Sequence, residues 1–147
     1  MTADPSSRTI VTTRIIHAPR EKVWQAWTTG EKLARWWGPK GFTNTFHEFN
    51  PVAGGLWRFT MHGPNDLQFE NESVFVELQK PERIVFDHQK PMHPFRAIVT
   101  FEAIGDSTKI IWQMVHDTVE ECEKVKSFVI PGNEENLDKL EAELATK

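Results

Sequence analysis

The sequence GGLWRFTMHGP at residues 54–64 alternates between large apolar and polar side chains. Trp57, Phe59 and Met61 fall on one face of an extended strand, and polar residues fall on the other. This period of two is typical of a β-strand with one buried face, because helical side chains return to the same face only every 3.6 residues. The glycines and proline at its ends are turn-forming residues. The stretch therefore predicts a half-buried strand between two turns.

The same alternation continues on both sides of this strand. Gly, Pro, Asn and Asp separate the successive runs, and short connections favour antiparallel neighbours. A run rich in β-branched residues at 8–17 adds a first strand. The remaining predicted strands lie near 42–49, 55–62, 69–79, 82–89, 95–104 and 108–116.

Helical spacing marks two short segments between the first two strands. Pro19 suits the first turn of a helix whose apolar face carries Val23, Trp24 and Trp27. Residues 31–37 offer a second short helix, which Gly38-Pro39 ends.

The C-terminal region is predicted to be helical in two pieces. Thr118 to Phe128 forms the first piece, with Thr118 as its cap. Pro131-Gly132 is expected to interrupt the helix, since proline lacks a backbone N–H. Asn133 to Ala145 forms the stronger piece, and Leu137, Leu140 and Leu144 make its apolar stripe.

These elements predict one α+β domain with the order β-α-α-β6-α. A length of 147 residues fits a single domain, expected here at 8–147 after a frayed end at 1–7. One face of the sheet is consistently apolar and needs a cover. The leucine stripe of the C-terminal helix is the expected cover.

The inner face of the predicted sheet is also the candidate binding site. The chain has ten Phe, six Trp and no Tyr, which favours a bulky, dry interior. Three leucines are a thin cover for such a long sheet, so a cavity that binds a small apolar ligand is expected beneath the helix. The alternative is that the rings only fill a core. The predicted lining residues are Trp57, Phe59, Met61, Phe86, His88, Val99, Phe101, Trp112, Met114 and Leu137.

Composition argues against several other classes of function. A net charge of −4 and a pI near 5.9 give no basic field for nucleic acid. The histidines lack metal-ligand spacing, and residues 38–41 lack the layout of a phosphate-binding loop, so neither a metal nor another cofactor is expected. Cys122 stands among glutamates, which disfavour a thiolate nucleophile. The first ten residues are not typical of a signal peptide, and no segment has the length of a membrane span, so a cytoplasmic protein is expected, as a monomer or homodimer.

Several motifs resemble the bacterial relatives of the activator of the 90-kDa heat-shock protein ATPase. The resemblance runs from about Arg8 to the C-terminus. It implies membership of the START-like, or Bet v 1-like (SRPBCC), superfamily, with a helix-grip fold: a curved antiparallel seven-stranded sheet around a long C-terminal helix. It also implies a hydrophobic cavity, but no shared reaction. The motifs are WWGPKGF at 36–42, GGLWRFTMHGP at 54–64, FENESVFVEL at 69–78, PERIVFDH at 81–88 and GNEENLDKLEAEL at 132–144.

Three functions remain open from the sequence. The first is a carrier or sensor for a small apolar or aromatic ligand. The second is a cyclase- or dehydratase-type enzyme that uses His88 or Glu72, although Glu72 is expected to be a solvated strand residue. The third is a protein that regulates a chaperone ATPase through its surface. Two converging buried ionisable groups would favour the enzyme, and a contiguous exposed apolar patch would favour the protein partner.

Overall fold

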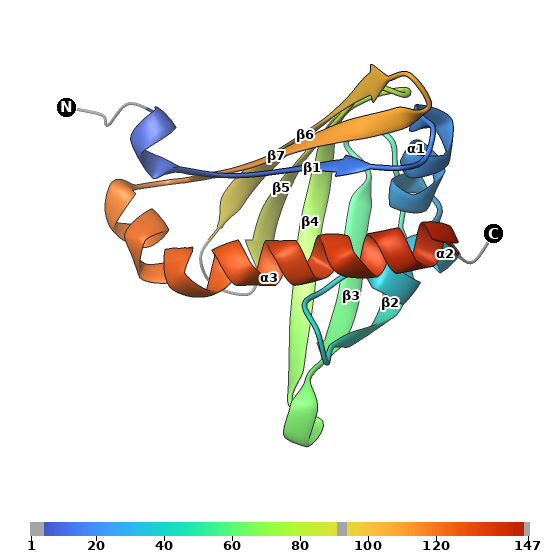
Figure 1. Cartoon of the computed structure of the whole chain (residues 1–147). Helices are drawn as coiled ribbons and strands as arrows, with labels where there is room; N and C mark the ends of the chain where they lie inside the picture. The colour runs from blue at the N-terminus through green and yellow to red at the C-terminus, as the bar shows by residue number, and fades with distance from the viewer. Residues whose placement is uncertain (1–4, 91–93, 146–147) are drawn as a thin grey trace.

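A computed structural model describes residues 5–90 and 94–145. Its seven strands form one antiparallel sheet in the spatial order β1-β7-β6-β5-β4-β3-β2 (Figure 1). The first strand thus pairs with the last, and the other strands follow as a meander. The strands are β1 (Thr9–Ile16), β2 (Thr43–Phe49), β3 (Leu56–His62), β4 (Gln68–Gln79), β5 (Arg83–Lys90), β6 (Phe95–Ile104) and β7 (Ser107–His116).

Three α-helices lie on one side of this sheet, which is called the inner face below. The two short helices, α1 (Arg20–Thr28) and α2 (Gly30–Trp36), follow β1 at one end of the sheet. The long α3 (Val119–Ala145) crosses the inner face and ends beside α2 (Figure 1). The α+β fold, the antiparallel seven-stranded sheet and the covering C-terminal helix are therefore confirmed. In the described part of the chain, no helix is long and apolar enough to cross a membrane.

The prediction of two C-terminal helices was wrong, because α3 continues through Pro131. Proline removes one backbone hydrogen bond and usually bends a helix instead of ending it when both halves are held by other contacts. Cys122 and Val125 are buried before Pro131, and Leu137 and Leu140 are buried after it. Packing on both sides thus keeps the helix continuous. Figure 1 shows the axis of α3 changing direction along its first half.

The helix begins where the sequence predicted. The hydroxyl of Thr118 accepts a hydrogen bond from the backbone N–H of Glu121 at 3.0 Å, as an N-cap does. Pro5–Arg8 form a turn of 3₁₀ helix, which overlaps the end of the segment 1–7 expected to be frayed. Residues 1–4 and residues 91–93 of the expected 89–94 loop lie outside the described residues.

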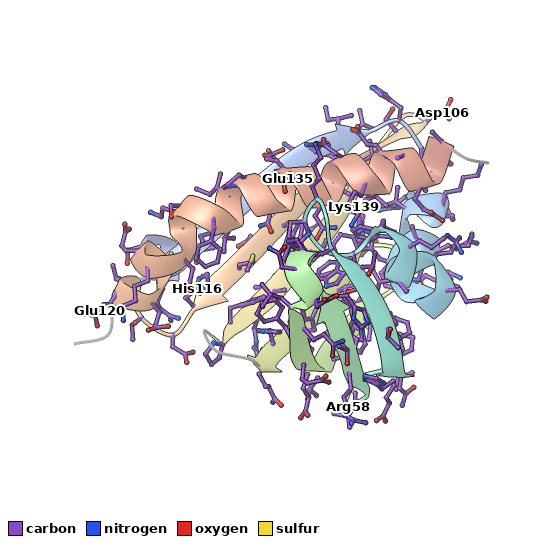
Figure 2. All side chains as sticks on the ribbon, turned by 90° about the horizontal axis from the view of Figure 1, so that it is seen from below. Arg58, Asp106, His116, Glu120, Glu135 and Lys139 are labelled. Atoms are coloured by element: carbon purple, nitrogen blue, oxygen red, sulfur yellow. The ribbon has the colours of Figure 1, made fainter. Side chains whose placement is uncertain are left out.

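Two sets of polar contacts fix α3 over the sheet. Arg14 on β1 pairs with Glu134 and Asp138 on α3, both at 2.7 Å. On the other side, Lys139 of α3 reaches the loop after α2, where its ammonium group donates to the carbonyl oxygens of Gly38 at 3.2 Å and Phe42 at 3.1 Å. Figure 2 shows Lys139 beside this loop. The segment 37–42, called the α2–β2 loop below, is thus held against α3.

Glycine is required at the centre of this attachment. Gly38 has φ +100°, a left-handed conformation that L-residues rarely adopt. Its backbone N–H donates to the side-chain oxygen of Asn136 at 3.2 Å, and the Asn136 amide donates to the carbonyl of Trp36 at 3.0 Å. Asn136 therefore satisfies backbone groups on both sides of the turn, and the turn places Trp37 over the sheet.

Candidate functional site

A cavity of about 290 Å³ lies between the middle of α3 and the inner face of the sheet. Its walls come from β3 to β7, from α3 and from the α2–β2 loop. A second space of about 380 Å³ shares Met61, His88, Phe95 and Met114 with it and extends toward Phe42. The two spaces thus form one groove. Helix α3 makes its close approaches to β1, β7, α1 and α2, which leaves this room over β3 to β6.

Most of the predicted lining residues surround the cavity. They are Trp57, Phe59, Met61, Phe86, His88, Trp112 and Met114. The other three, Val99, Phe101 and Leu137, are fully buried in the core and are not part of this lining. Strand parity placed the strand residues among them on the inner face, and the helical leucine stripe placed Leu137 toward the sheet. Neither pattern says where the packing opens.

The α2–β2 loop contributes the ring at the centre of the cavity floor. Trp37 lies with its ring centre 5.1 Å from Trp57 and 5.6 Å from Trp112, and it also meets Phe86 edge to face. Aromatic pairs at such separations add about 0.5–1.5 kcal/mol beyond their buried area. The floor is therefore a rigid set of packed rings, and its shape depends on the loop that holds Trp37.

The indole N–H groups of Trp57 and Trp112 are not accessible from the cavity. The Nε1 atoms of Trp57 and Trp112 are fully buried and have no hydrogen-bond partner among the described residues. Both rings make edge-to-face contacts, Trp57 with Phe86 and Trp112 with Trp27. The polar chemistry of the cavity thus comes from other residues.

Five polar side chains interrupt the apolar lining of the cavity, and one of them, Asn136, is engaged with the α2–β2 loop. Asn71 and Ser73 lie on β4, His88 lies on β5, and Asn133 reaches down from α3. Ser73 and His88 are paired across the two strands, and Ser73 Oγ is 3.4 Å from His88 Nδ1. Asn133 donates its amide to Thr12 Oγ1 at 3.3 Å. The cavity therefore has an apolar body and a small polar seat formed by Asn71, Ser73 and His88.

Burial sets the charge of His88. Desolvation lowers the pKa of its imidazole from 6.5 to about 4, because the charged form loses hydration that the apolar surroundings do not replace. The ring also stacks on Phe95, with centres 4.9 Å apart and an interplanar angle of 23°. His88 is therefore a neutral, fixed hydrogen-bonding group at physiological pH.

Several lining residues were missed by the sequence-based prediction. Asn71 and Ser73 share the inner face of β4 with Phe75, so the alternation of FENESVF contained the signal that would have placed them. Phe128 and Val129 belong to the part of α3 near Pro131, where a break had been predicted. Asn133 and Asn136 lay on a helix for which only the leucine stripe was considered.

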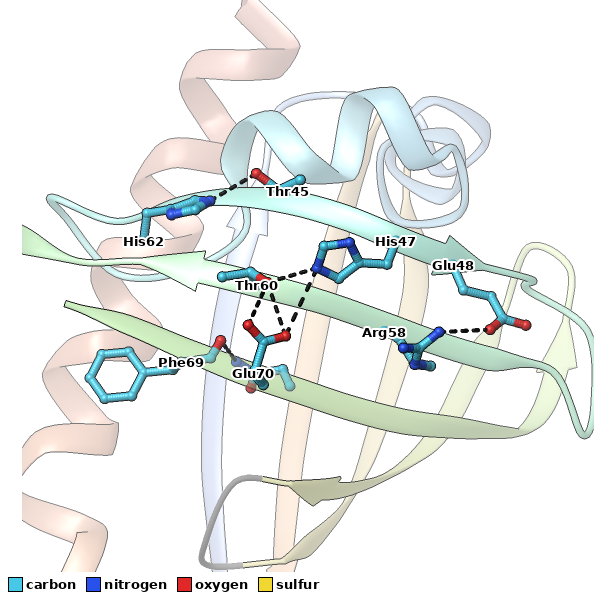
Figure 3. Close-up of polar contacts among 9 residues, drawn as sticks. Thr45, His47, Glu48, Arg58, Thr60, His62, Phe69 and Glu70 are labelled. Atoms are coloured by element: carbon cyan, nitrogen blue, oxygen red, sulfur yellow. Dashed lines mark hydrogen bonds and ion pairs between the residues drawn. The ribbon is translucent and has the colours of Figure 1, made fainter. Parts of the chain in front are cut away.

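Glu72 and two of the histidines lie away from the cavity. Glu72 borders a separate hollow on the outer face of the sheet, together with His47, Arg58 and Glu70. His47 Nε2 lies 2.7 Å from Thr60 Oγ1, and the Thr60 hydroxyl donates to Glu70 at 2.8 Å. Figure 3 shows these contacts across β2, β3 and β4, with a hydrogen bond between His62 and Thr45 nearby. Glu72 is therefore not placed to act on a molecule in the cavity.

The remaining candidate groups are readily placed. Cys122 lies on the first half of α3 with its side chain buried, and this burial raises the pKa of its thiol. The first cause is desolvation, and the charge of Glu123 adds less. Within residues 5–90 and 94–145, no three His, Cys, Asp or Glu side chains gather into a metal-binding group.

Comparison with known proteins agrees with this geometry. The family model described as "Activator of Hsp90 ATPase homolog 1-like protein" matches residues 17–145. No curated protein has a significant match to the sequence.

Solved structures share the fold at low sequence identity. A crystal structure from Nitrosomonas europaea has a TM-score of 0.88 at 19% identity and covers 99% of both chains. One from Rhodobacter sphaeroides has a TM-score of 0.89 at 20% identity, covering 100% of this chain and 99% of the other. The AHSA1 protein from Silicibacter pomeroyi has a TM-score of 0.77 at 18% identity, covering 94% and 98%. With its helix-grip architecture and the family match over most of its length, the chain belongs to the Activator of Hsp90 ATPase homolog 1-like family, within the START-like, or Bet v 1-like, superfamily.

Proposed function

We propose that this protein binds a small, largely apolar molecule in the cavity beneath α3, as a carrier or sensor. The observation that carries the proposal is the cavity itself, about 290 Å³ of space walled by Trp57, Phe86 and Trp112. Interiors normally pack without voids much larger than a water molecule. The three rings are at most 3% exposed, whereas the lining residues Met61 and His88 are only partly buried around the space. Ligand sites are typically hollows of about 300–1,000 Å³ with apolar walls and a few polar groups.

An enzymatic role has weaker support in the geometry. A cyclase or dehydratase of the predicted type needs ionisable groups that converge on its substrate. Glu72 borders the outer hollow. His88 and His116 lie on either side of Phe95, whose ring is 4.9 Å from one imidazole and 5.7 Å from the other. The two histidines are therefore separated by an apolar ring, and binding without chemistry is the simpler function.

Native mass spectrometry of the freshly purified protein tests the proposal. A carrier is expected to show a mass above that of the polypeptide, and denaturing spectra of the same sample should return the polypeptide mass alone. Extraction with organic solvent then identifies the released molecule. Absence of any adduct, together with no saturable binding of a neutral apolar dye, would reject a binding function for the cavity.

A protein partner is the second candidate, and its support lies on the outer face of the sheet. Val11 and Ile15 on the edge strand β1 are 56% and 49% exposed. Exposed apolar residues that gather on one surface are typical of contact sites. The family description makes an Hsp90-type ATPase the partner to test. Stimulation of its ATPase rate by the wild-type protein, lost in a Val11→Ser, Ile15→Ser double variant, would support this second candidate.

A further inference from the structure

Within the polar seat, the imidazole of His88 has a hydrogen-bonding atom to spare. Nδ1 of His88 faces Ser73 Oγ, whereas Nε2 has no hydrogen-bond partner among the described residues. Among the described residues, the fully buried polar atoms without a partner do not include Nε2, so this unpaired atom keeps some accessible surface. The stack on Phe95 fixes the plane of the imidazole ring. A molecule in the cavity thus meets an oriented nitrogen without displacing an existing hydrogen bond.

The surroundings of this nitrogen favour an uncharged partner. Every lining side chain of the described residues is apolar, an amide, a hydroxyl or an imidazole, with no carboxylate, ammonium or guanidinium group among them. The burial that lowers the pKa of His88 to about 4 keeps it neutral at physiological pH. An isolated charge moved from water into such a site loses hydration worth several kcal/mol, which a neutral imidazole and a hydroxyl do not replace.

The ammonium group of Lys139, on α3 beside the α2–β2 loop, is already engaged. Lys139 Nζ donates to the backbone carbonyls of Gly38, Pro39 and Phe42, and it is not part of the cavity lining. Burial lowers the pKa of its ammonium group, as expected for a cation held among uncharged acceptors. Lys139 thus fixes the α2–β2 loop and does not neutralise an acidic ligand.

We propose that the cavity selects ligands whose buried polar group is an uncharged hydroxyl or carbonyl, held by His88, and discriminates against carboxylates and amines of the same carbon skeleton. This inference rests on the proposed binding function and narrows its ligand class. The two tautomers of His88 present different hydrogen-bonding groups to a ligand at Nε2. When Ser73 donates to Nδ1, the Nε2–H group donates to a ligand hydroxyl or carbonyl oxygen. When Nδ1–H donates to Ser73, Nε2 accepts from a ligand hydroxyl.

A matched ligand series tests the selection directly. Decanol, decanoate and decylamine share a ten-carbon chain and differ only in the end group. Each is titrated, below its micelle concentration, against protein loaded with the neutral dye N-phenyl-1-naphthylamine at about pH 8. Decanol is expected to displace the dye at concentrations at least about tenfold lower than either charged compound, since burying an unpaired charge costs more than 1.4 kcal/mol. At about pH 5, decanoate should approach decanol because more of it is protonated.

Variants separate the role of His88 from a general preference for neutral molecules. His88→Leu is expected to weaken decanol binding about tenfold more than it weakens dye binding. His88→Gln keeps an uncharged hydrogen-bonding group and should retain most of the preference. The matched control is His47→Leu on the outer face, which should change neither affinity. Circular dichroism and thermal melts confirm that each variant is folded.

Each outcome decides a different claim. Failure of the wild-type protein to bind the dye or decanol would overturn the proposed function and this inference together. Dye binding with decanoate or decylamine displacing as well as decanol at pH 8 would overturn the neutral selection and leave a binding function standing. A decanol preference unchanged in His88→Leu would remove His88 from the proposal.

Discussion

Ser73 and His88 occupy directly paired positions on β4 and β5, and Ser73 Oγ lies 3.4 Å from His88 Nδ1. Strand pairing therefore brings the hydroxyl and the imidazole together, independently of any loop. Asn71 lies two residues from Ser73 on the same face of β4. Because strands position side chains more rigidly than loops do, the side chains of this polar seat have fixed positions in the cavity wall.

The buried His88 should make folding stability depend on pH. Its pKa is about 4 in the folded protein, against 6.5 for a solvated imidazole in an unfolded chain. Well above pH 6.5 the imidazole is neutral in both the folded and the unfolded state, so no proton has to be removed when His88 is buried. As the pH falls from 6.5 toward 4, the unfolded state takes up the proton first, and the free energy of unfolding should fall by up to about 3 kcal/mol.

His88→Gln isolates this contribution from the other histidines. Denaturant unfolding of the variant and the wild type between about pH 7.5 and 4.5 should give a smaller loss of stability in the variant. Equal losses in both proteins would show that His88 is not the group responsible.

Two glycines near the cavity should respond in opposite ways to alanine. Gly132 lies inside α3, and a Cβ there would meet only Pro39 Cβ at 3.9 Å. Gly132→Ala should therefore raise the free energy of unfolding by about 0.5–1 kcal/mol, since alanine is the better helix former. Gly38 has φ +100°, so Gly38→Ala should lower it by about 1–3 kcal/mol. Chemical denaturation measures both, and destabilisation by Gly132→Ala would contradict the open space described at that position.

The α2–β2 loop should loosen when Lys139 is removed. Lys139→Met keeps the length of the side chain but loses the hydrogen bonds to the Gly38 and Phe42 carbonyls. A loss of about 1–3 kcal/mol in unfolding free energy is expected, along with faster amide exchange at residues 38–42. Lys126 provides the control, because its pair with Glu123 is exposed on a single helix. Lys126→Met should leave stability nearly unchanged, and a similar effect of both variants would contradict the attachment.

Strand parity was sufficient to predict the sheet and much of the cavity wall. The alternation in Trp57, Phe59 and Met61, repeated in Phe86 and Trp112, fixes which side chains face α3, because a one-residue slip would reverse every face. The same pattern carried Asn71 and Ser73, whose small polar side chains give no hydrophobic signal of their own.

The open space itself could not be predicted from a local pattern. It depends on where α3 stands over the sheet, which the contacts of Arg14 and Lys139 with distant segments determine. Continuation of α3 through Pro131 likewise depends on packing along both halves. For the same reason, Phe101 and Leu137 have the expected inward orientation but lie in closed core.

Substitution of Trp112 tests whether this ring belongs to the closely packed floor of the cavity or stands in open space. Trp112 is 3% exposed and packs on Trp27 and Trp37. Trp112→Ala should therefore lower the free energy of unfolding by about 3–5 kcal/mol, as for other large-to-small core changes. A much smaller loss, measured by denaturant unfolding, would place this ring in open space. Dye binding by the variant must be measured well below its melting temperature, because partly unfolded chains also bind such dyes.

Filling the cavity tests the central claim most directly. Met61 is half-buried and borders both spaces, so Met61→Trp places a large ring where they meet. Val11→Trp adds the same ring on the exposed outer face of β1 and serves as the control. The measurement is the affinity for N-phenyl-1-naphthylamine by fluorescence titration of the three folded proteins. The account predicts saturable binding to the wild type and Val11→Trp, weakened at least about tenfold in Met61→Trp. Equal affinity in all three proteins would contradict a ligand site beneath α3.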